Sequence, residues 1–228
     1  MTYVLIPGAG GQAWYFHRLV PELAARGQEA IAVDLPAADN SAGLVEYADA
    51  VVDAIGARTD VTLVAQSLGG FTAPLVCDRA DVSLLILLNA MVPLPGESPD
   101  DWWEATGHAE AKAEHAAREG RGGGFDLLAD FFHDVPEHVV AEATAQDEPE
   151  QSMTPMRPPW PLDDWPEVPT RFLQGRDDRF FPLEFQRRVV KERLELDVDE
   201  MPGGHLVALS RPAELADRLE AYRTTLVR

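Results

Sequence analysis

Short apolar runs alternate along the chain with stretches in which apolar residues recur every three to four positions. Runs such as Leu84–Leu88 are apolar at every position, which is typical of strands covered on both faces of a parallel sheet. The predicted strands are Tyr3–Ile6, Ala30–Val33, Val61–Ala65, Leu84–Leu88, Thr170–Leu173 and Leu196–Val198.

The stretches between the first strands have the spacing of amphipathic helices. A strand, helix, strand rhythm predicts a three-layer α/β fold, with a mostly parallel central sheet between two layers of helices. A chain of 228 residues fits one domain of this kind, so we expect a single domain over residues 1–228. The first helix is predicted from Trp14, Leu19, Val20 and Leu23, and the second from Leu44, Tyr47, Ala48, Val51, Val52 and Ile55.

One long section interrupts this rhythm. From about residue 93 to 168 no convincing strand is found, while prolines and the tryptophans Trp102, Trp103, Trp160 and Trp165 accumulate. Insertions of this length in compact domains are usually functional or disordered. We expect a helical cap insertion over about residues 93–168 that covers a site, and an insertion without a role is the alternative.

A serine directly follows the third predicted strand. Ser67 lies between a buried strand and a helix, with the small residues Ala65 and Gly69 two positions away on either side. This is the arrangement of a nucleophile elbow, a turn so tight that its flanking residues must be small and its serine takes a strained, positive φ. Ala65 stands in place of the usual first glycine and meets the same steric requirement. A serine that caps the following helix is the alternative interpretation.

Acidic residues and a histidine follow the last two predicted strands. Asp177 and Asp178 come shortly after Thr170–Leu173, and His205 follows two glycines after the final strand. The chain order serine, aspartate, histidine is that of a catalytic triad on this fold, in which the histidine takes the serine proton and the carboxylate orients the imidazole. We therefore expect Ser67 as nucleophile, His205 as base and one of the two aspartates as the acid.

The glycine-rich turn after the first strand has two interpretations. Backbone N–H groups of Ala9 in this turn and of Leu68 after the serine could form an oxyanion hole. Alternatively, residues 8–13 satisfy the loose pattern G-x-G-x-x-G/A, and Asp34 ends the next strand as a ribose-binding acid would. That alternative, a dinucleotide-binding oxidoreductase, leaves the three triad residues unexplained.

Several segments together resemble a known family. They span almost the whole chain, most weakly from Trp103 to Leu128, and they are similar to the methylesterase and hydroxynitrile lyase branch of the α/β hydrolases. The resemblance implies a small, apolar-bodied substrate held under a helical cap. The segments are Val4–Trp14, Ala32–Pro36, the elbow, Leu88–Pro93 and Phe180–Gln186.

Departures from this family narrow the expected activity. Pro7 stands where the family usually has histidine, and Gly8 and Leu206 stand where the lyases carry threonine and lysine. The resemblance therefore favours an esterase over a lyase. The family pattern also places the acid three residues after a glycine and four before a proline, and counts from Gly175 and from Pro182 both select Asp178.

Composition excludes several classes of partner. The chain has 39 acidic and 19 basic residues and a formal charge of -20, which would repel nucleic acid and anionic membranes. Cys77 is the single cysteine, and His108 and His115 lack the spacing of metal ligands. We expect a cytoplasmic serine hydrolase that needs neither metal nor cofactor and whose partner is a small-molecule ester. A receptor-like homologue that binds without turnover is the main alternative.

Overall fold

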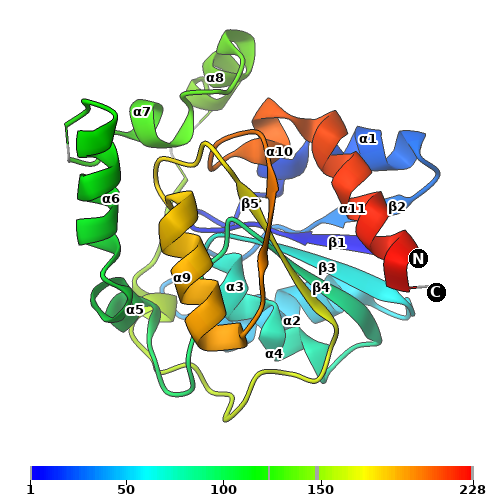
Figure 1. Cartoon of the computed structure of the whole chain (residues 1–228). Helices are drawn as coiled ribbons and strands as arrows, with labels where there is room; N and C mark the ends of the chain where they lie inside the picture. The colour runs from blue at the N-terminus through cyan, green and yellow to red at the C-terminus, as the bar shows by residue number, and fades with distance from the viewer. Residues whose placement is uncertain (1, 123, 147–148, 227–228) are drawn as a thin grey trace.

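A six-stranded sheet with helices on both faces forms the centre of the molecule (Figure 1). The computed structural model describes residues 2–122, 124–146 and 149–226. Every strand pair is parallel, in the order β2-β1-β3-β4-β5-β6. The strands are β1 (Thr2–Ile6), β2 (Glu29–Ala32), β3 (Val61–Gln66), β4 (Val82–Leu88), β5 (Thr170–Gly175) and β6 (Val198–Met201). The predicted α/β fold is confirmed.

Helices cover the sheet in two layers, as the alternating apolar patterns predict. The helices are η1 (Ala13–Phe16), α1 (Leu19–Ala25), α2 (Leu44–Ile55), α3 (Gly69–Thr72), α4 (Pro74–Cys77), α5 (Pro99–Thr106), α6 (His108–Arg118), α7 (Leu127–Phe131), α8 (Glu137–Thr144), η2 (Thr154–Met156), α9 (Leu183–Leu194), α10 (Val207–Ser210) and α11 (Pro212–Leu226). In the described part of the chain, no helix combines the length and the apolar character needed to cross a membrane.

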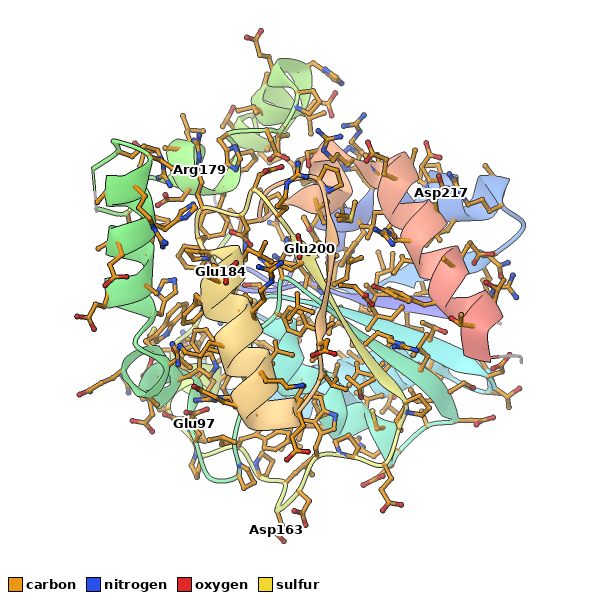
Figure 2. All side chains as sticks on the ribbon, viewed as in Figure 1. Glu97, Asp163, Arg179, Glu184, Glu200 and Asp217 are labelled. Atoms are coloured by element: carbon orange, nitrogen blue, oxygen red, sulfur yellow. The ribbon has the colours of Figure 1, made fainter. Side chains whose placement is uncertain are left out.

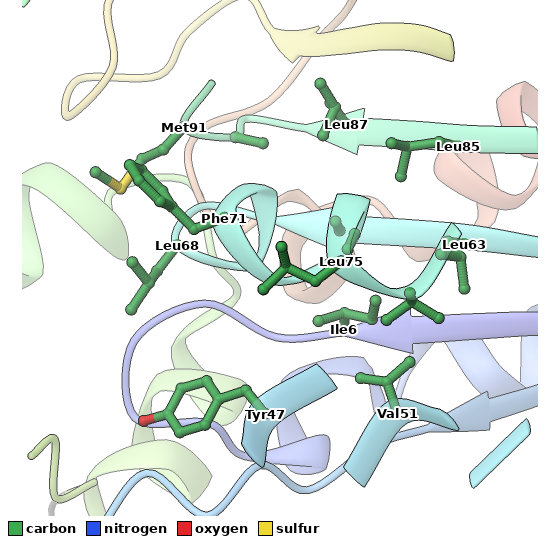
Figure 3. Packing of buried hydrophobic residues seen from close by; sticks show 14 of the residues in the cluster. Ile6, Tyr47, Val51, Leu63, Leu68, Phe71, Leu75, Leu85, Leu87 and Met91 are labelled. Carbon is green, nitrogen blue, oxygen red and sulfur yellow. The ribbon is translucent and has the colours of Figure 1, made fainter. Parts of the chain in front are cut away.

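Successive residues of each strand point to opposite faces, and this divides the core in two. Val4 and Ile6 belong to a cluster that packs with α2, α3, α4 and α9, part of which Figure 3 shows. Tyr3 and Leu5, one position away, belong to a second cluster with α1, α10 and α11. Both faces of β1 are therefore buried, which explains its unbroken apolar run.

Two predicted elements were wrong in detail. The last strand is Val198–Met201, not Leu196–Val198. This strand lies at the edge of the sheet, where the polar residues Asp199 and Glu200 remain partly exposed. It therefore lacks the apolar run by which the other strands are predicted. The predicted first helix is two elements, the 3-10 turn η1 and the helix α1, which together preserve its apolar face.

The segment between β4 and β5 carries α5 to α8 and, within its described residues, contains no strand. A buried ion pair joins its two parts: Lys112 Nζ on α6 lies 2.8 Å from Asp130 Oδ2 on α7. Arg179, which follows β5, donates to the carbonyl of Ala129 at 3.2 Å and so ties α7 to the sheet (Figure 2). These contacts join α6 to α7, and α7 to the loop that follows β5.

The outer surface is strongly acidic, as the formal charge of -20 requires. Glu184 and Asp217, labelled in Figure 2, are examples, and their side chains are 67% and 70% exposed although each is paired with an arginine. Surface pairs of this kind add little stability, so the acidity mainly affects solubility and the encounter with charged molecules.

Candidate active site

Ser67 lies in a strained turn between β3 and α3. Its φ is 51°, so the predicted positive φ is confirmed. Gly69 must lack a side chain, because a Cβ there would lie 2.9 Å from the carbonyl oxygen of Pro7. Gly70 is more confined still, with only 1.9 Å between a Cβ and the carbonyl oxygen of Met91. The close approach of β1, β3 and β4 at this edge of the sheet therefore dictates the small residues of the elbow.

His205 and Asp178 are brought together in the interior. The imidazole Nδ1 lies 2.8 Å from Asp178 Oδ2, and both side chains are fully buried. The other carboxylate oxygen, Oδ1, accepts hydrogen bonds of 2.8 Å from the backbone N–H groups of Phe180 and Phe181. Gln174 Nε2 donates to Oδ2 at 3.2 Å. Three donors thus hold the buried carboxylate in one orientation against the imidazole.

Asp177 has a different role in the same loop. Its carboxylate accepts a hydrogen bond of 3.0 Å from the backbone N–H of Gly203, two residues before His205. Partial burial acts to raise the pKa of Asp177, but the Gly203 N–H and the charge of Arg176 outweigh it and hold the pKa below its ordinary value. Asp177 therefore braces the histidine loop from outside the site and faces no reacting group.

The first turn brings its backbone to the same place. The N–H of Gly8 donates to Gln66 Oε1 at 3.1 Å, and the N–H of Gly10 donates to Gln151 Oε1 at 2.9 Å. Among the described residues, the N–H groups of Ala9 and Leu68 have no acceptor, and both residues line the cavity that contains Ser67. Two unused donors beside a serine are the arrangement an oxyanion hole requires.

The same turn gives the dinucleotide alternative no support. In a dinucleotide-binding fold this turn would lead directly into a long helix whose N-terminus binds the pyrophosphate. Here it leads into the four-residue 3-10 helix η1. Asp34 Oδ1 accepts a hydrogen bond of 2.7 Å from the N–H of Ala13, so this carboxylate holds the turn itself.

A cavity of about 580 Å³ opens beside Ser67. Aromatic and aliphatic side chains dominate its walls, and the segment between β4 and β5 supplies many of them. None of the described lining residues is Asp, Glu, Lys or Arg. The lining includes Trp14, Tyr15, Leu68, Met91, Trp103, Phe125, Leu127, Phe131, Phe132, Met156, Phe180, Leu206 and Leu209. Its size and character suit an uncharged organic molecule.

Sequence reasoning missed the side chains that surround the imidazole. Phe131, Phe180 and Phe181 place their rings 4.7, 5.2 and 5.1 Å from that of His205, centroid to centroid. Gln66 Nε2 lies 3.1 Å from His205 Nε2. In the described structure no hydrogen bond joins the Ser67 hydroxyl to the imidazole. The Phe180-Phe181 pair next to Asp178 is a signal that the sequence contained, whereas Gln66 and Phe131 gave none.

The remaining histidines do not form a second centre. His108 Nε2 donates to the carbonyl of Phe180 at 2.7 Å, and burial lowers the pKa of this imidazole. Over the described ranges, no group of three or more His, Cys, Asp or Glu side chains is placed to hold a metal ion.

Comparison with known proteins identifies the family. The sequence profile described as "Alpha/beta hydrolase family" matches residues 3–218. The chain belongs to this family. It is 24% identical to an alpha-hydroxynitrile lyase of Arabidopsis thaliana, across 97% of this chain and 96% of the other. It is 26% identical to the probable esterase PIR7A of Oryza sativa subsp. indica, across 95% and 94%. These relatives place this α/β hydrolase in the methylesterase and hydroxynitrile lyase branch.

Solved structures agree on the fold. A pyrethroid hydrolase from Sphingobium faniae JZ-2 superposes with a TM-score of 0.74 at 24% identity, covering 97% of this chain and 96% of that one. Polyneuridine aldehyde esterase superposes with a TM-score of 0.75 at 20% identity, covering 97% and 98%. The two relatives named above are a lyase and a probable esterase, and the two solved structures share the fold of this α/β hydrolase.

Proposed function

We propose that this α/β hydrolase is a serine esterase that cleaves uncharged, largely apolar esters through an acyl-enzyme on Ser67. The observation that carries the proposal is the meeting of Ser67, His205 and the backbone N–H groups of Ala9 and Leu68 on one cavity. Among the described residues these two N–H groups have no acceptor, and the cavity walls carry no Asp, Glu, Lys or Arg. The esterases among its homologues support the same reaction class. The molecular partner is then a small-molecule ester, with no part for nucleic acid, membrane or cofactor.

The proposed reaction begins with attack of Ser67 Oγ on the ester carbonyl. The hydroxyl proton passes to His205 Nε2 as the new C–O bond forms, and the Ala9 and Leu68 N–H groups bind the oxyanion. The imidazolium then gives this proton to the leaving alcohol. Water repeats the sequence on the acyl-enzyme and releases the acid, which restores the serine. Asp178 holds the imidazole and stabilises its charged form.

The test is a panel of neutral short-chain, branched and aromatic esters assayed with the wild type and Ser67→Ala. We expect Ser67→Ala to lower kcat/KM by about 10³-fold or more. Ser83→Ala is the matched control, because Ser83 Oγ bonds to Asp60 at 2.7 Å near the amino end of β4, far along the strand from the site. Wild-type hydrolysis that survives in Ser67→Ala would refute the proposal.

Charge selectivity gives a second arm of the test. A dimethyl ester of a dicarboxylic acid should be hydrolysed at least about tenfold faster than its monomethyl counterpart, since the described walls offer no cation for the free carboxylate. Equal rates on the two would contradict the proposed substrate class.

The same protein samples distinguish an esterase from a lyase and from a receptor that binds without turnover. A lyase would release cyanide from an aromatic hydroxynitrile, and Gly8 and Leu206 lead us to expect none. A receptor-like homologue would react with a serine-directed phosphonate yet turn over no ester. Esterase turnover together with phosphonate labelling of Ser67 supports the proposal, and labelling without turnover supports the receptor.

A further inference from the structure

The side-chain amide of Gln66 bridges the first turn and the histidine. Its Oε1 lies 3.1 Å from the backbone nitrogen of Gly8, and its Nε2 lies 3.1 Å from His205 Nε2. Gln66 ends β3 directly before Ser67, and its side chain is 4% exposed. A Cβ on Gly8 would come within 2.6 Å of Gln66 Oε1, so the bridge depends on glycine at that position.

The donor and acceptor types of Gly8, Gln66, His205 and Asp178 allow one arrangement of protons along this bridge. A backbone N–H can only donate, so the amide oxygen of Gln66 must face Gly8. The amide NH₂ group therefore faces His205 Nε2, which must accept with its lone pair. The single proton of the neutral imidazole is then on Nδ1, where it donates to Asp178 Oδ2 at 2.8 Å. The Gly8 N–H at one end of this chain of side chains and the acceptor-only Asp178 carboxylate at the other therefore require the same protonation pattern.

We propose that Gln66 is a positioning residue that locks His205 in the Nδ1–H tautomer and couples the imidazole to the turn carrying the Ala9 N–H. This role rests on the proposed function, because a base needs a free lone pair on Nε2 only if it takes the proton of Ser67. The lock keeps the proton off Nε2 before any substrate arrives, and the Gln66 amide occupies the lone pair until the Ser67 hydroxyl replaces it.

The lock also affects the charged state of the imidazole. To act as a base, Nε2 exchanges the Gln66 N–H for the Ser67 hydroxyl. Once protonated, Nε2–H would face the Gln66 NH₂ group, and two donors cannot bond to each other. The imidazolium is therefore favoured only while it bonds to the reacting oxygens, and the proton is returned readily. Asp178 bonds to the imidazole, His108 and Tyr15 lie near this pair, and Asp134 and His133 pack against the adjacent Gly204. These titratable groups are the same in every variant below.

Gln66→Glu tests the lock most directly. The carboxylate has nearly the same shape and still accepts from Gly8, but it presents an acceptor to His205 Nε2 and so moves the proton there. We expect nitrogen-15 NMR of labelled histidine to show Nδ1–H in the wild type and Nε2–H or imidazolium in Gln66→Glu. We expect kcat at neutral pH to fall by about 10²-fold, with KM within about twofold, and the acidic limb of the kcat profile to move to higher pH.

Gln66→Met separates the lock from packing, because it keeps the volume and removes both hydrogen bonds. Asp178 still accepts from Nδ1, so we expect Nδ1–H to persist, and we expect kcat to fall about tenfold because the imidazole is no longer tied to the first turn. The matched control is Gln186→Met, which removes another fully buried glutamine, one whose Nε2 bonds to Ala90 at 2.9 Å and not to the site. That control should retain the wild-type tautomer and profile.

The NMR experiment needs no substrate, so the lock and the esterase can fail separately. An Nε2–H tautomer in the wild type, or a neutral Nδ1–H imidazole retained in Gln66→Glu, would overturn the lock even if Ser67 hydrolyses esters. A wild type with Nδ1–H that Gln66→Glu abolishes supports the lock even if no ester is turned over, in which case only the proposed function fails.

Discussion

The ring of Phe131 meets the imidazole of His205 edge to face, with centroids 4.7 Å apart and planes at 89°. Phe131 ends α7 in the segment between β4 and β5, whereas His205 lies in the loop after β6. The cover of the cavity and the proposed base are therefore one packing unit. A shift of α7 would alter the surroundings of the imidazole directly, even though α7 carries no proposed catalytic residue.

Replacement of Phe131 should reveal this contact. Phe131→Leu keeps an apolar side chain but loses the ring pair, worth about 0.5–1.5 kcal/mol, so kcat/KM should fall by about 2- to 12-fold. Steady-state kinetics on a neutral ester measures the effect. Leu128→Ala is the control, because Leu128 lies on the same helix, is 52% exposed and does not line the cavity. An equal loss in both variants would mean that α7 matters only through its stability.

The two adjacent aspartates should differ sharply. Asp178→Asn should lower kcat by about 10³- to 10⁴-fold, because an amide in place of the carboxylate favours the wrong imidazole tautomer. Asp177→Asn should cost less than about tenfold, since Asp177 bonds only to the loop backbone and to Arg176. kcat for both folded variants decides between them. The reverse ranking would give the role to Asp177, and two near-wild-type rates would exclude this triad.

Backbone strain at Ser67 predicts that replacing this residue by glycine increases the stability of the fold relative to replacing it by alanine. A non-glycine residue at a φ of 51° is strained, at a cost of about 1–3 kcal/mol. Ser67→Gly relieves this strain, although glycine adds about 1 kcal/mol of backbone entropy to the unfolded chain. We expect it to be about 1 kcal/mol more stable than Ser67→Ala, which stays strained. Urea unfolding compares the two inactive variants, and a less stable Ser67→Gly would show that the turn holds no strain.

The buried imidazole of His108 makes stability depend on pH. Burial lowers its pKa in the folded state, so the unfolded chain binds more protons below the ordinary histidine pKa of about 6.5. The stability from neutral His108 is complete above that pH and is lost as the pH falls toward the lower folded pKa. His108→Gln keeps an N–H donor for the Phe180 carbonyl but does not titrate.

Urea unfolding between pH 7.5 and 5 should therefore show a shallower loss of stability in His108→Gln than in the wild type. The exposed His138 supplies the control variant His138→Gln, which should follow the wild-type curve. Parallel curves for all three proteins would show that folding does not change the pKa of His108.

Sequence reasoning succeeded where burial leaves a clear pattern. Central strands such as β4 are apolar at almost every position because helices cover both faces, and the elbow is marked by the steric need for Gly69. It failed at β6, whose edge position admits Asp199 and Glu200 among its four residues. An edge strand such as β6 forms by pairing with β5, and the local sequence pattern of β6 carries no information about this partner.

The contacts around the imidazole show a second limit. The order of Ser67, Asp178 and His205 along the chain was informative, because parallel strands bring their following loops to one edge. Gln66 reaches His205 across 139 positions, and no periodicity distinguishes it from any other glutamine at a strand end. Such roles come from long-range packing and become visible only in three dimensions.

Under the proposed function, a cavity without charged walls in an acidic molecule should retain the uncharged ester and the anionic acid product to different extents. An ester enters uncharged and does not sense the formal charge of -20, whereas hydrolysis creates a carboxylate beside described walls that contain neither Lys nor Arg. The new anion has no counter-charge to retain it, and the field of the protein drives it outward. Product inhibition should then come from the alcohol more than from the acid, and added salt should weaken that distinction.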